Sequence, residues 1–237
     1  MLSIIIPTLN EATNLRRTIP RTLRAAAGAD VELIVSDCDS RDGTADVSRE
    51  LGAMVVCGSR CRAEALNRGT AAARRDVLVF VHADTHQPIG FADVIARALA
   101  DPRIVGGAFD WEWDEHPLNA GWNRACLKMV EMVNRTRFRW THNFYGDQTI
   151  FVRRSVFDRI GGFPPVRLME DIRFCRQMKR RGRVAILRPP VRTSPRRFVS
   201  RGVVRQFLHD LTLLAWESCG AKPEKLWDRY NRWNHQV

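Results

Sequence analysis

Hydrophobic and polar positions divide the first third of the chain into two kinds of segment. Short runs rich in β-branched residues predict strands at 2–7, 31–37, 53–58 and 76–82, and the segments between them predict helices within 8–29, 39–52 and 60–75. Asn10 or Thr13 is expected to cap the first helix. Strands that alternate with helices at this spacing predict an α/β fold, with a mostly parallel sheet covered by helices on both faces.

The pattern is less regular after residue 90. It predicts a helix near 90–100, a strand at 104–113, a helix across 118–134, an irregular segment at 135–147, a strand at 148–154 and a helix that begins near 170. The last 35 or so residues are expected to form amphipathic helices, with Leu208, Leu211, Leu214 and Ala215 on one side.

The length and the 45% apolar content favour a single domain. We assign residues 1–200 to its main body, in two halves at about 1–100 and about 101–200. Residues 201–237 form a helical extension of the same domain. No apolar run approaches the roughly 18–20 residues that span a bilayer, and the N-terminus lacks the features of a signal peptide. These features predict a cytoplasmic protein, or one peripheral to the inner face of a membrane.

Charge and cysteine content narrow the possible partners. The formal net charge of +12 implies attraction to anions such as nucleotide diphosphates, acidic lipid surfaces or nucleic acid, and arginines concentrate within 167–205. The six cysteines form no CxxC pair and no zinc-like spacing, which indicates reduced thiols and no structural zinc.

Candidate ligand-binding side chains follow the predicted strands. His82 and Asp84 end the buried fourth strand. In an extended chain, two residues separated by a single residue point to the same side. Open α/β sheets bind ligands at this carboxyl edge. Asp84 can supply a hard oxygen ligand to a divalent ion, although a lone acid at a strand end is usually a turn residue. Asp37 follows the second strand and can accept hydrogen bonds from a base or ribose. The nearby Asp42-Gly43-Thr44 also fits an ordinary turn with a helix cap.

Two common nucleotide-binding motifs are missing from the sequence. There is no GxGxxG after the first strand and no GxxxxGK[ST], which disfavours dinucleotide oxidoreductases and P-loop NTPases.

The chain contains four segments that together resemble a family 2 glycosyltransferase of the GT-A fold: LSIIIPTLNEATNL, LIVSDCDSRDGTADV, AEALNRGTAAARRDVLVFVHADT and LMEDIRFCRQMKRRGR. They lie in the family's order over about residues 2–187. The HADT, YGDQ and LMED segments, with the arginines after them, are nearest to the small soluble branch of arsenosugar-biosynthesis glycosyltransferases. The resemblance implies the nucleotide-diphospho-sugar transferase fold and inverting transfer of a sugar from a nucleotide-diphosphate sugar, preferentially a UDP-sugar. It also implies that about 1–100 is the nucleotide-binding half and about 101–200 the acceptor half.

The resemblance also implies a donor site. His82-Ala83-Asp84 takes the place of the family's Asp-x-Asp, so Asp84 binds the metal and His82 is a second candidate ligand. Because imidazole replaces one acid, Mn²⁺ is favoured over Mg²⁺. Cys38 stands where many members have a second acid. The implied nucleotide-binding residues are Pro7, Thr8, Asn10, Glu11, Asp37, Arg62, Asn67, Ala83 and Asp84.

The catalytic base is expected in the segment MED. Inverting transfer needs a group that takes the acceptor's proton, and we assign this role to Asp171, with Glu170 orienting it or binding the acceptor. The reverse assignment stays open, and an acidic pair at a helix start also complements the helix dipole. The further implied acceptor or diphosphate contacts are Tyr145, Gly146, Asp147, Gln148 and Arg197.

Two other side-chain groups are candidates at this site. Trp140, His142 and Tyr145 could form a stacking wall, or they could be core and loop anchors. Arginines can stabilise a departing diphosphate where few side chains bind the metal. The candidates for that role are Arg192, Arg196, Arg197 and Arg201.

Three alternatives stay open. A sugar nucleotidyltransferase would need a Gly-rich, Arg/Lys-bearing loop after the first strand, which PTLNEATNL is not. A basic protein that binds nucleic acid or a membrane surface through 176–205 and the terminal helix would not depend on Asp84 or Asp171. A degenerate GT-A protein would bind nucleotide without catalysis. The leading interpretation expects a small-molecule or lipid-phosphate acceptor and no specific nucleic acid, and it leaves the oligomeric state open.

Overall fold

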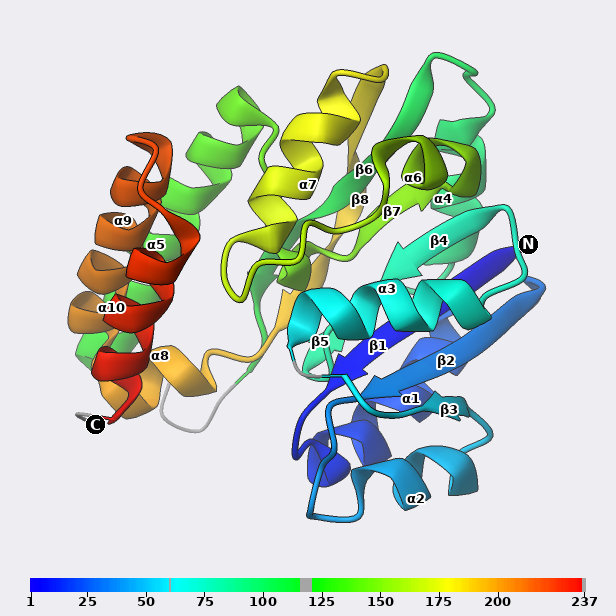
Figure 1. The fold of residues 1–237 in the computed structure, drawn as a ribbon, viewed down its shortest axis with the longest axis horizontal. Coiled ribbons are helices and arrows are strands. Elements are labelled where there is room, and N and C mark those ends of the chain that lie inside the picture. Colours follow the sequence, from blue (N-terminus) through cyan, green and yellow to red (C-terminus); the bar gives the residue numbers. More distant parts are fainter. Residues whose placement is uncertain (60, 116–120, 236–237) are drawn as a thin grey trace.

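The computed structural model describes residues 1–59, 61–115 and 121–235, and within them it forms one eight-stranded mixed sheet (Figure 1). The strand order is β3-β2-β1-β4-β7-β6-β8-β5. Strands β3, β2, β1 and β4 are parallel neighbours, whereas β7 runs antiparallel to β4 and β6. The strands are β1 (Leu2–Thr8), β2 (Val31–Asp37), β3 (Met54–Val56), β4 (Val77–Phe80), β5 (Thr85–His86), β6 (Ile104–Trp113), β7 (Ile150–Arg153) and β8 (Arg183–Thr193).

Helices cover both faces of this sheet, and a further group packs beside it. Figure 1 shows α3, α6 and α7 on one face, α1 and α4 on the other, and α5, α8, α9 and α10 together at one side. The helices are α1 (Ala12–Ala25), α2 (Thr44–Glu50), α3 (Arg62–Ala72), α4 (Phe91–Leu99), α5 (Gly121–Thr141), η1 (Gly146–Gln148, a 3₁₀ turn), α6 (Arg154–Ile160), α7 (Glu170–Lys179), α8 (Arg196–Arg201), α9 (Val203–Ser218) and α10 (Pro223–His235).

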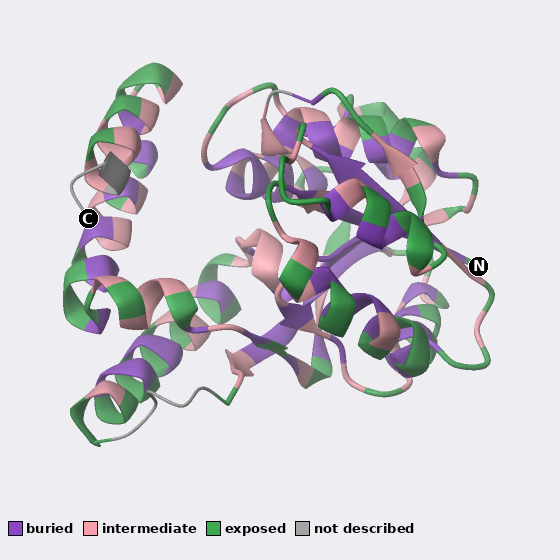
Figure 2. Cartoon of the chain, turned by 90° about the horizontal axis from the view of Figure 1, so that it is seen from below, coloured by how far each residue is buried: buried purple, intermediate pink, exposed green. Residues whose placement is uncertain are grey.

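The main core lies between the sheet and these helices, where the central strands β1, β4 and β7 are almost wholly buried (Figure 2). Phe80 on β4 contacts a cluster of aromatic rings from α6, α7 and the loop between them, and Phe163 and Phe174 stack with 4.3 Å between ring centroids. Aromatic pairs of this kind add to the free energy gained from burial. The cluster therefore fixes the start of α7 close to the end of β4.

The α/β fold with a mostly parallel sheet is confirmed. The predicted strands and helices of the first 100 residues occur at nearly the expected positions. The long strand β8 was not predicted. It pairs in parallel with β6 and antiparallel with β5, and so extends the sheet beyond the region that the βαβ pattern indicated.

Three local predictions were wrong. Helix α5 continues through 135–141, where an irregular segment was expected, because Arg135 and Arg139 on one helix face both bind the buried Asp110. The predicted first residues of this helix, 118–120, lie outside the described residues. Neither Asn10 nor Thr13 caps α1, which begins at Ala12 without a side-chain cap. In α9 the buried face contains Phe207 and Leu213, whereas Leu208 and Ala215 are exposed.

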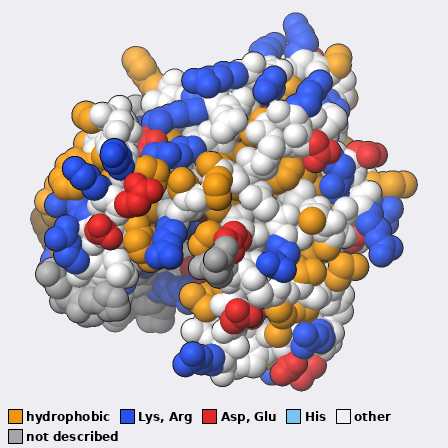
Figure 3. Space-filling model, viewed as in Figure 1, with side chains coloured by type: hydrophobic (Ala, Val, Ile, Leu, Met, Phe, Trp, Pro, Cys, Tyr) orange, Lys and Arg blue, Asp and Glu red, His pale blue; other side chains and the backbone are white. Residues whose placement is uncertain are grey.

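The basic residues are distributed rather than gathered. Figure 3 shows Lys and Arg side chains over all parts of one face of the molecule, with acidic side chains among them. In the described part of the chain, no helix combines the length and the apolar character needed to cross a bilayer.

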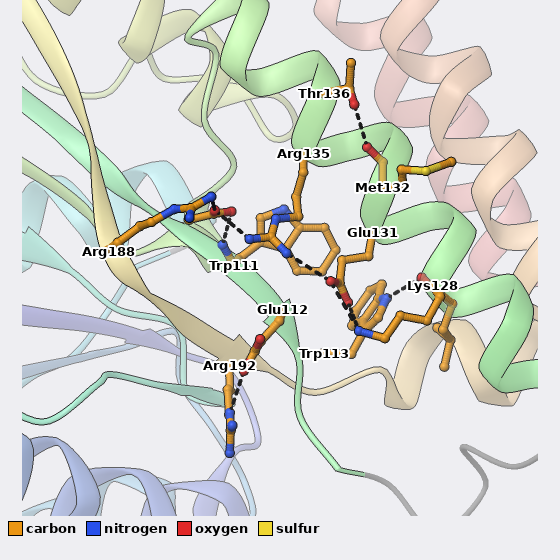
Figure 4. A network of polar contacts seen from close by, with 12 residues as sticks. Trp111, Glu112, Trp113, Lys128, Glu131, Met132, Arg135, Thr136, Arg188 and Arg192 are labelled. Atoms are coloured by element: carbon orange, nitrogen blue, oxygen red, sulfur yellow. Dashed lines mark hydrogen bonds and ion pairs between the residues drawn. The ribbon is translucent and has the colours of Figure 1, made fainter.

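A buried carboxylate joins α5 to the sheet. Asp110 on β6 is fully buried, and its Oδ2 accepts hydrogen bonds from Arg135 (2.7 Å) and Arg139 (2.9 Å) and lies 3.2 Å from Arg188. Burial alone would raise the pKa of Asp110, but the hydrogen bonds from Arg135 and Arg139 lower it. The surrounding polar network includes Glu112, which pairs with Arg192 at 2.8 Å (Figure 4).

We expect Asp110→Ala to lower the free energy of unfolding by about 3 kcal/mol, because it leaves three guanidinium groups without their shared anion. The matched variant Glu112→Ala, two residues along the same strand, removes an exposed ion pair and should cost about 0.5 kcal/mol. Urea unfolding curves measure both. Equal costs for the two variants would contradict the anchoring role of Asp110.

Candidate active site

A cavity of about 250 Å³ lies beyond the carboxyl end of β4, between the sheet and the C-terminal helices. It brings together side chains from β6, α3, α7, α8, α9 and α10 and from the loops after β4 and α5. The predicted site residues that line it are Arg62, His82, Asp84, Tyr145, Gly146, Asp147, Asp171 and Arg197.

His82 and Asp84 reach the cavity from a turn rather than from an extended strand. β4 ends at Phe80, and the N–H of Thr85 donates to the carbonyl oxygen of His82 at 3.1 Å. The two side chains therefore lie together as predicted, but the turn places them there and not the alternation of side chains along a strand. Burial, with help from the charge of Arg62, lowers the pKa of His82 to about 3, so its ring is neutral.

Asp84 is held beside Arg196, the first residue of α8. The Arg196 Nε lies 3.3 Å from Asp84 Oδ2, and its Nη2 lies 2.6 Å from Glu11 Oε1. Burial raises the pKa of Asp84, while Arg196 acts against this rise. Arg196 thus joins the loop after β1 to the turn after β4.

Helix α7 presents its two acids to different partners. Glu170 is only 1% exposed, and its Oε1 accepts a hydrogen bond from Arg62 Nε. Asp171 lines the cavity, where its Oδ2 accepts the N–H of Gly146 at 2.9 Å and lies 3.8 Å from Arg62 Nη2. Burial and the charge of Glu170 raise the pKa of Asp171, and Arg62 opposes the rise. Met169, directly before the pair, has a φ of +62°, a conformation that is strained for a non-glycine residue.

The turn η1 closes one wall of the cavity. A Cβ atom on Gly146 would lie 2.4 Å from His82 Nε2, so only glycine allows this approach. Asp147 follows it into the cavity. Burial raises the pKa of Asp147 to about 7, and the charges of Asp171 and Asp84 add to the rise. The site therefore holds three carboxylates whose charges oppose one another.

Several predicted nucleotide residues support the loops around the cavity. Asp37 is 2% exposed, and its carboxylate accepts hydrogen bonds from Thr8 Oγ1 and from Ser40. The Asn10 N–H donates to Ser40 Oγ at 2.7 Å, and Asn67 pairs with the backbone of Phe163 through both ends of its amide. The residues that the structure does not bring to the cavity lining are Pro7, Thr8, Asn10, Glu11, Asp37, Asn67, Ala83, Gln148 and Glu170.

Among the candidate arginines and aromatic side chains, some line the cavity and others do not. Arg197 lines the cavity and pairs with Asp210 at 3.0 Å, whereas Arg192 pairs with Glu112 outside it. The predicted stacking wall was wrong for Trp140, which is 85% exposed. Tyr145 does line the cavity.

The sequence-based analysis missed an apolar wall opposite the carboxylates. One signal was present, because two tryptophans at alternate positions of a predicted strand are expected on the same face. The amphipathic C-terminal helices were a second signal. The members of this wall are Trp111, Trp113, Phe198, Phe207, Leu211 and Leu213.

The described residues contain no cluster of three His, Cys, Asp or Glu side chains arranged to hold a metal ion by themselves. Asp84 does present a carboxylate to the cavity, near the charge of Asp147. A divalent ion would relieve this repulsion and could complete its coordination with oxygens of a bound ligand. The residues present therefore fit a metal that is shared with a phosphate ligand.

Comparison with known proteins identifies the family. Residues 3–161 match the sequence model described as "Glycosyl transferase family 2". Over 180 residues the chain is 31% identical to the "PGL/p-HBAD biosynthesis glycosyltransferase" of Mycobacterium bovis (strain BCG / Pasteur 1173P2). The match covers 69% of this chain and 63% of that relative, so the chain spans less than two thirds of the relative's length.

Solved structures share the fold, and two examples show how far the similarity extends. The mannosyltransferase PcManGT from Pyrobaculum calidifontis, in complex with GDP-Man and Mn²⁺, has a TM-score of 0.60 and 23% identity, over 80% of this chain and 54% of that one. Glucosyl-3-phosphoglycerate synthase from Mycobacterium tuberculosis, in complex with Mn²⁺, UDP and glucosyl-3-phosphoglycerate, has a TM-score of 0.59 and 20% identity, over 94% and 81%. The predicted GT-A fold is thereby confirmed.

The raised pKa of Asp147 has a consequence for stability. In the unfolded chain an aspartate has a pKa near 3.8, so between that value and about 7 the folded state binds more protons, and stability falls as the pH rises. We expect Asp147→Asn to unfold at a higher temperature than the parent at pH 8 in EDTA, by a few °C, and to show no such gain at pH 4.

The exposed Asp228 provides the control. Asp228→Asn removes a carboxylate outside the cavity and should match the parent at both pH values. Equal unfolding temperatures of Asp147→Asn and the parent at pH 8 would contradict the electrostatic crowding of the cavity.

Proposed function

The chain belongs to glycosyl transferase family 2, and we propose that it is an inverting glycosyltransferase that moves a sugar from a nucleotide-diphosphate sugar to a hydroxyl-bearing acceptor. One observation carries the proposal: Asp84, Asp147 and Asp171 meet Arg62 and Arg197 in a single cavity beside the carboxyl end of a parallel strand. Ligands of open α/β sheets bind at this edge.

The donor diphosphate is proposed to bind between the turn after β4 and α8. Arg196 and Arg197 supply guanidinium groups there, which suit the charge that develops on a departing diphosphate. A bound divalent ion would neutralise part of that charge, held by Asp84, with the neutral ring of His82 as a second candidate ligand. The Mn²⁺ complexes of the two solved structures support a metal, and the imidazole favours Mn²⁺ over Mg²⁺.

The nucleotide is proposed to lie against the loops after β1 and β2. Asp37 holds Thr8 and Ser40, so its contribution includes shaping this pocket. The named complexes of similar structures contain UDP in one case and GDP-Man in another. We propose a uridine nucleotide as the donor, and the first binding experiments should include both UDP-sugars and GDP-sugars.

Asp171 is the proposed base. It lines the cavity, whereas Glu170 is buried against Arg62, and this difference favours Asp171 over Glu170 for the role. The acceptor oxygen forms a bond to the anomeric carbon while the bond from that carbon to the diphosphate oxygen breaks. The electron pair leaves with the nucleoside diphosphate, and the acceptor proton passes to the Asp171 carboxylate. The backbone N–H of Gly146 and the Arg62 guanidinium orient that carboxylate.

The C-terminal helices are proposed to be part of the same domain. Residues of α9 and α10 complete the cavity wall that faces Asp171, so 201–237 would serve the site that 1–200 begins. This arrangement is compatible with a small-molecule acceptor and with a lipid-phosphate acceptor.

We expect Asp84→Asn and Asp171→Asn to fail at different steps. Asp84→Asn should weaken Mn²⁺-dependent binding of a UDP-sugar or GDP-sugar by at least roughly tenfold, measured by calorimetry. Asp171→Asn should still bind donor but lower kcat by about 10²–10⁴-fold, because it cannot accept the proton.

The exposed Asp228→Asn is the control for both variants and should behave as the parent does. Donor binding that is the same in the parent and in Asp84→Asn would refute the assigned donor site. Binding of any polyanion with no effect of either substitution would favour the non-enzymatic alternative.

A further inference from the structure

Two chemically different groups of side chains line the cavity. The polar group includes Arg62, His82, Asp84, Asp147 and Asp171, with Asn134, Arg197 and Asp210 from the C-terminal part of the chain. The apolar group consists of Trp111, Trp113, Phe198, Phe207, Leu211 and Leu213. An apolar pocket with a few converging polar groups is the usual form of a small-molecule site.

The aromatic members of this wall form a continuous row. The rings of Trp111 and Trp113 meet edge to face with centroids 4.7 Å apart, and Trp113 lies 5.0 Å from Phe198. The Nε1–H of Trp113 donates to the carbonyl oxygen of Leu127 at 2.9 Å, on α5. The only polar group of that side chain is therefore satisfied elsewhere, and its ring offers apolar surface to the cavity.

The helices α8 and α9 add Phe198, Phe207, Leu211 and Leu213 to the wall, and their Arg197 and Asp210 line the cavity as an ion pair. Phe198, Phe207 and Leu211 belong to, or pack against, a small core cluster that is separate from the main one. This cluster joins α5, α8 and α9, and so gives the wall a fixed shape. Sugar hydroxyls placed against the faces of its aromatic rings would lose hydrogen bonds to water and gain none from those rings.

Resting on the proposed function, we propose that the acceptor is a compound whose reacting hydroxyl is carried by an apolar, ring-sized body. The body lies against the row of Trp111, Trp113 and Phe198, and the hydroxyl points to Asp171. An apolar cavity of about 150 Å³ can hold a benzene ring. The cavity here, at about 250 Å³, is large enough for a ring with a short substituent.

Three hydroxyl-bearing compounds test whether the protein prefers an apolar or a polar acceptor. Para-butylphenol presents its hydroxyl on an apolar ring, whereas methyl glucoside and glycerol present theirs on polar bodies. With the full-length protein, Mn²⁺ and UDP- and GDP-sugars, we expect nucleoside diphosphate release to rise at least about tenfold with para-butylphenol and much less with the other two. Donor turnover with methyl glucoside or glycerol as the better acceptor would overturn the inference.

Variants of the apolar wall test whether para-butylphenol binds there. Leu211→Asn places an amide in the wall and should raise KM for para-butylphenol by roughly tenfold, with a smaller change in kcat. Leu208→Asn, one turn away on the exposed face of α9, should match the parent. Phe198→Ala is the second wall variant, in case Leu211→Asn does not fold. A KM unchanged in the folded wall variants would place the acceptor elsewhere.

Failure of the proposed function has a different signature. Donor hydrolysis and donor binding are measured in the parent without any acceptor. If neither occurs with any nucleotide sugar, the glycosyltransferase proposal fails, and the acceptor inference falls with it. Donor binding and hydrolysis without stimulation by para-butylphenol would overturn the acceptor inference alone.

A different observation carries a second inference, which concerns the outer face of α5. Trp122 is 77% exposed and Trp140 is 85% exposed, and both lie on this helix with Met129, Met132 and Val133 exposed between them. At 1.5 Å per residue the two tryptophans stand about 27 Å apart. Figure 4 shows Glu131 and Arg135 on the strand side of α5 and Met132 on the other side.

Positive charge accompanies this stripe. Asp110 and Glu131 are buried, and four cations surround them: Lys128, Arg135, Arg139 and Arg188. The cations of this network outnumber its two buried carboxylates, and the side chains of Lys128 and Arg139 are 66% and 45% exposed. A helix with exposed tryptophans and basic flanks has the character of one that lies in the interface of an anionic bilayer.

We propose that this face of α5 binds an anionic lipid surface. In flotation assays the protein should bind vesicles of phosphatidylcholine mixed with phosphatidylglycerol, and bind less to phosphatidylcholine alone or at high salt. The double variant Trp122→Ser/Trp140→Ser should lose binding by about tenfold or more. Ile89→Ser removes an exposed apolar side chain outside α5 and should bind as the parent does.

Two results would overturn this second inference. One is no binding of the parent to anionic vesicles. The other is a parent dimer that the double variant converts to a monomer, measured by light scattering, because a second copy of the chain would then occupy the stripe.

Discussion

Arg62 is the connection on which the candidate site depends. It extends from α3, contacts Glu170 and Asp171 at the start of α7, and so joins two halves of the fold that are 108 residues apart in the sequence. A buried acid is costly unless it is paired with a cation and hydrogen-bonded. Glu170 serves mainly to hold Arg62, whereas Asp171 keeps a carboxylate facing the cavity. Two adjacent acids thus have different environments, and only one faces the space where a substrate could lie.

The same burial makes the empty cavity electrostatically unfavourable. Burial raises the pKa values of Asp84, Asp147 and Asp171, and the charges of Asp171 and Asp84 raise that of Asp147 further, while Arg62 and Arg196 act against these rises. A cation that arrives with its ligand would relieve this repulsion. The strained Met169 and the close approach of Gly146 to His82 hold the acids in place meanwhile. Part of the folding stability is thus given up at this site to position charge.

The C-terminal helices add a second kind of surface to the site. The sheet and its loops provide charge, while α8 and α9 provide apolar side chains next to the tryptophans of β6. The boundary between the two surfaces passes close to Asp171, so a molecule with one polar and one apolar end would fit across it. Asp110 supports this arrangement because it anchors α5, against which α9 packs.

The sequence by itself determined the α/β fold, the mostly parallel sheet and the place of Asp84 at a strand end, because strand and helix periods and turn positions are local properties. Asp147 and Asp171 became candidates through the resemblance of their segments to a known family. The sequence could not give the end of β4, the length of α5 or the partner of Glu170. Those depend on contacts such as Arg135 with Asp110 and Arg62 with Glu170, which join distant segments. Only the tertiary structure placed Trp111, Trp113 and Leu211 in one cavity with Asp171, since no local pattern records which distant side chains share a cavity.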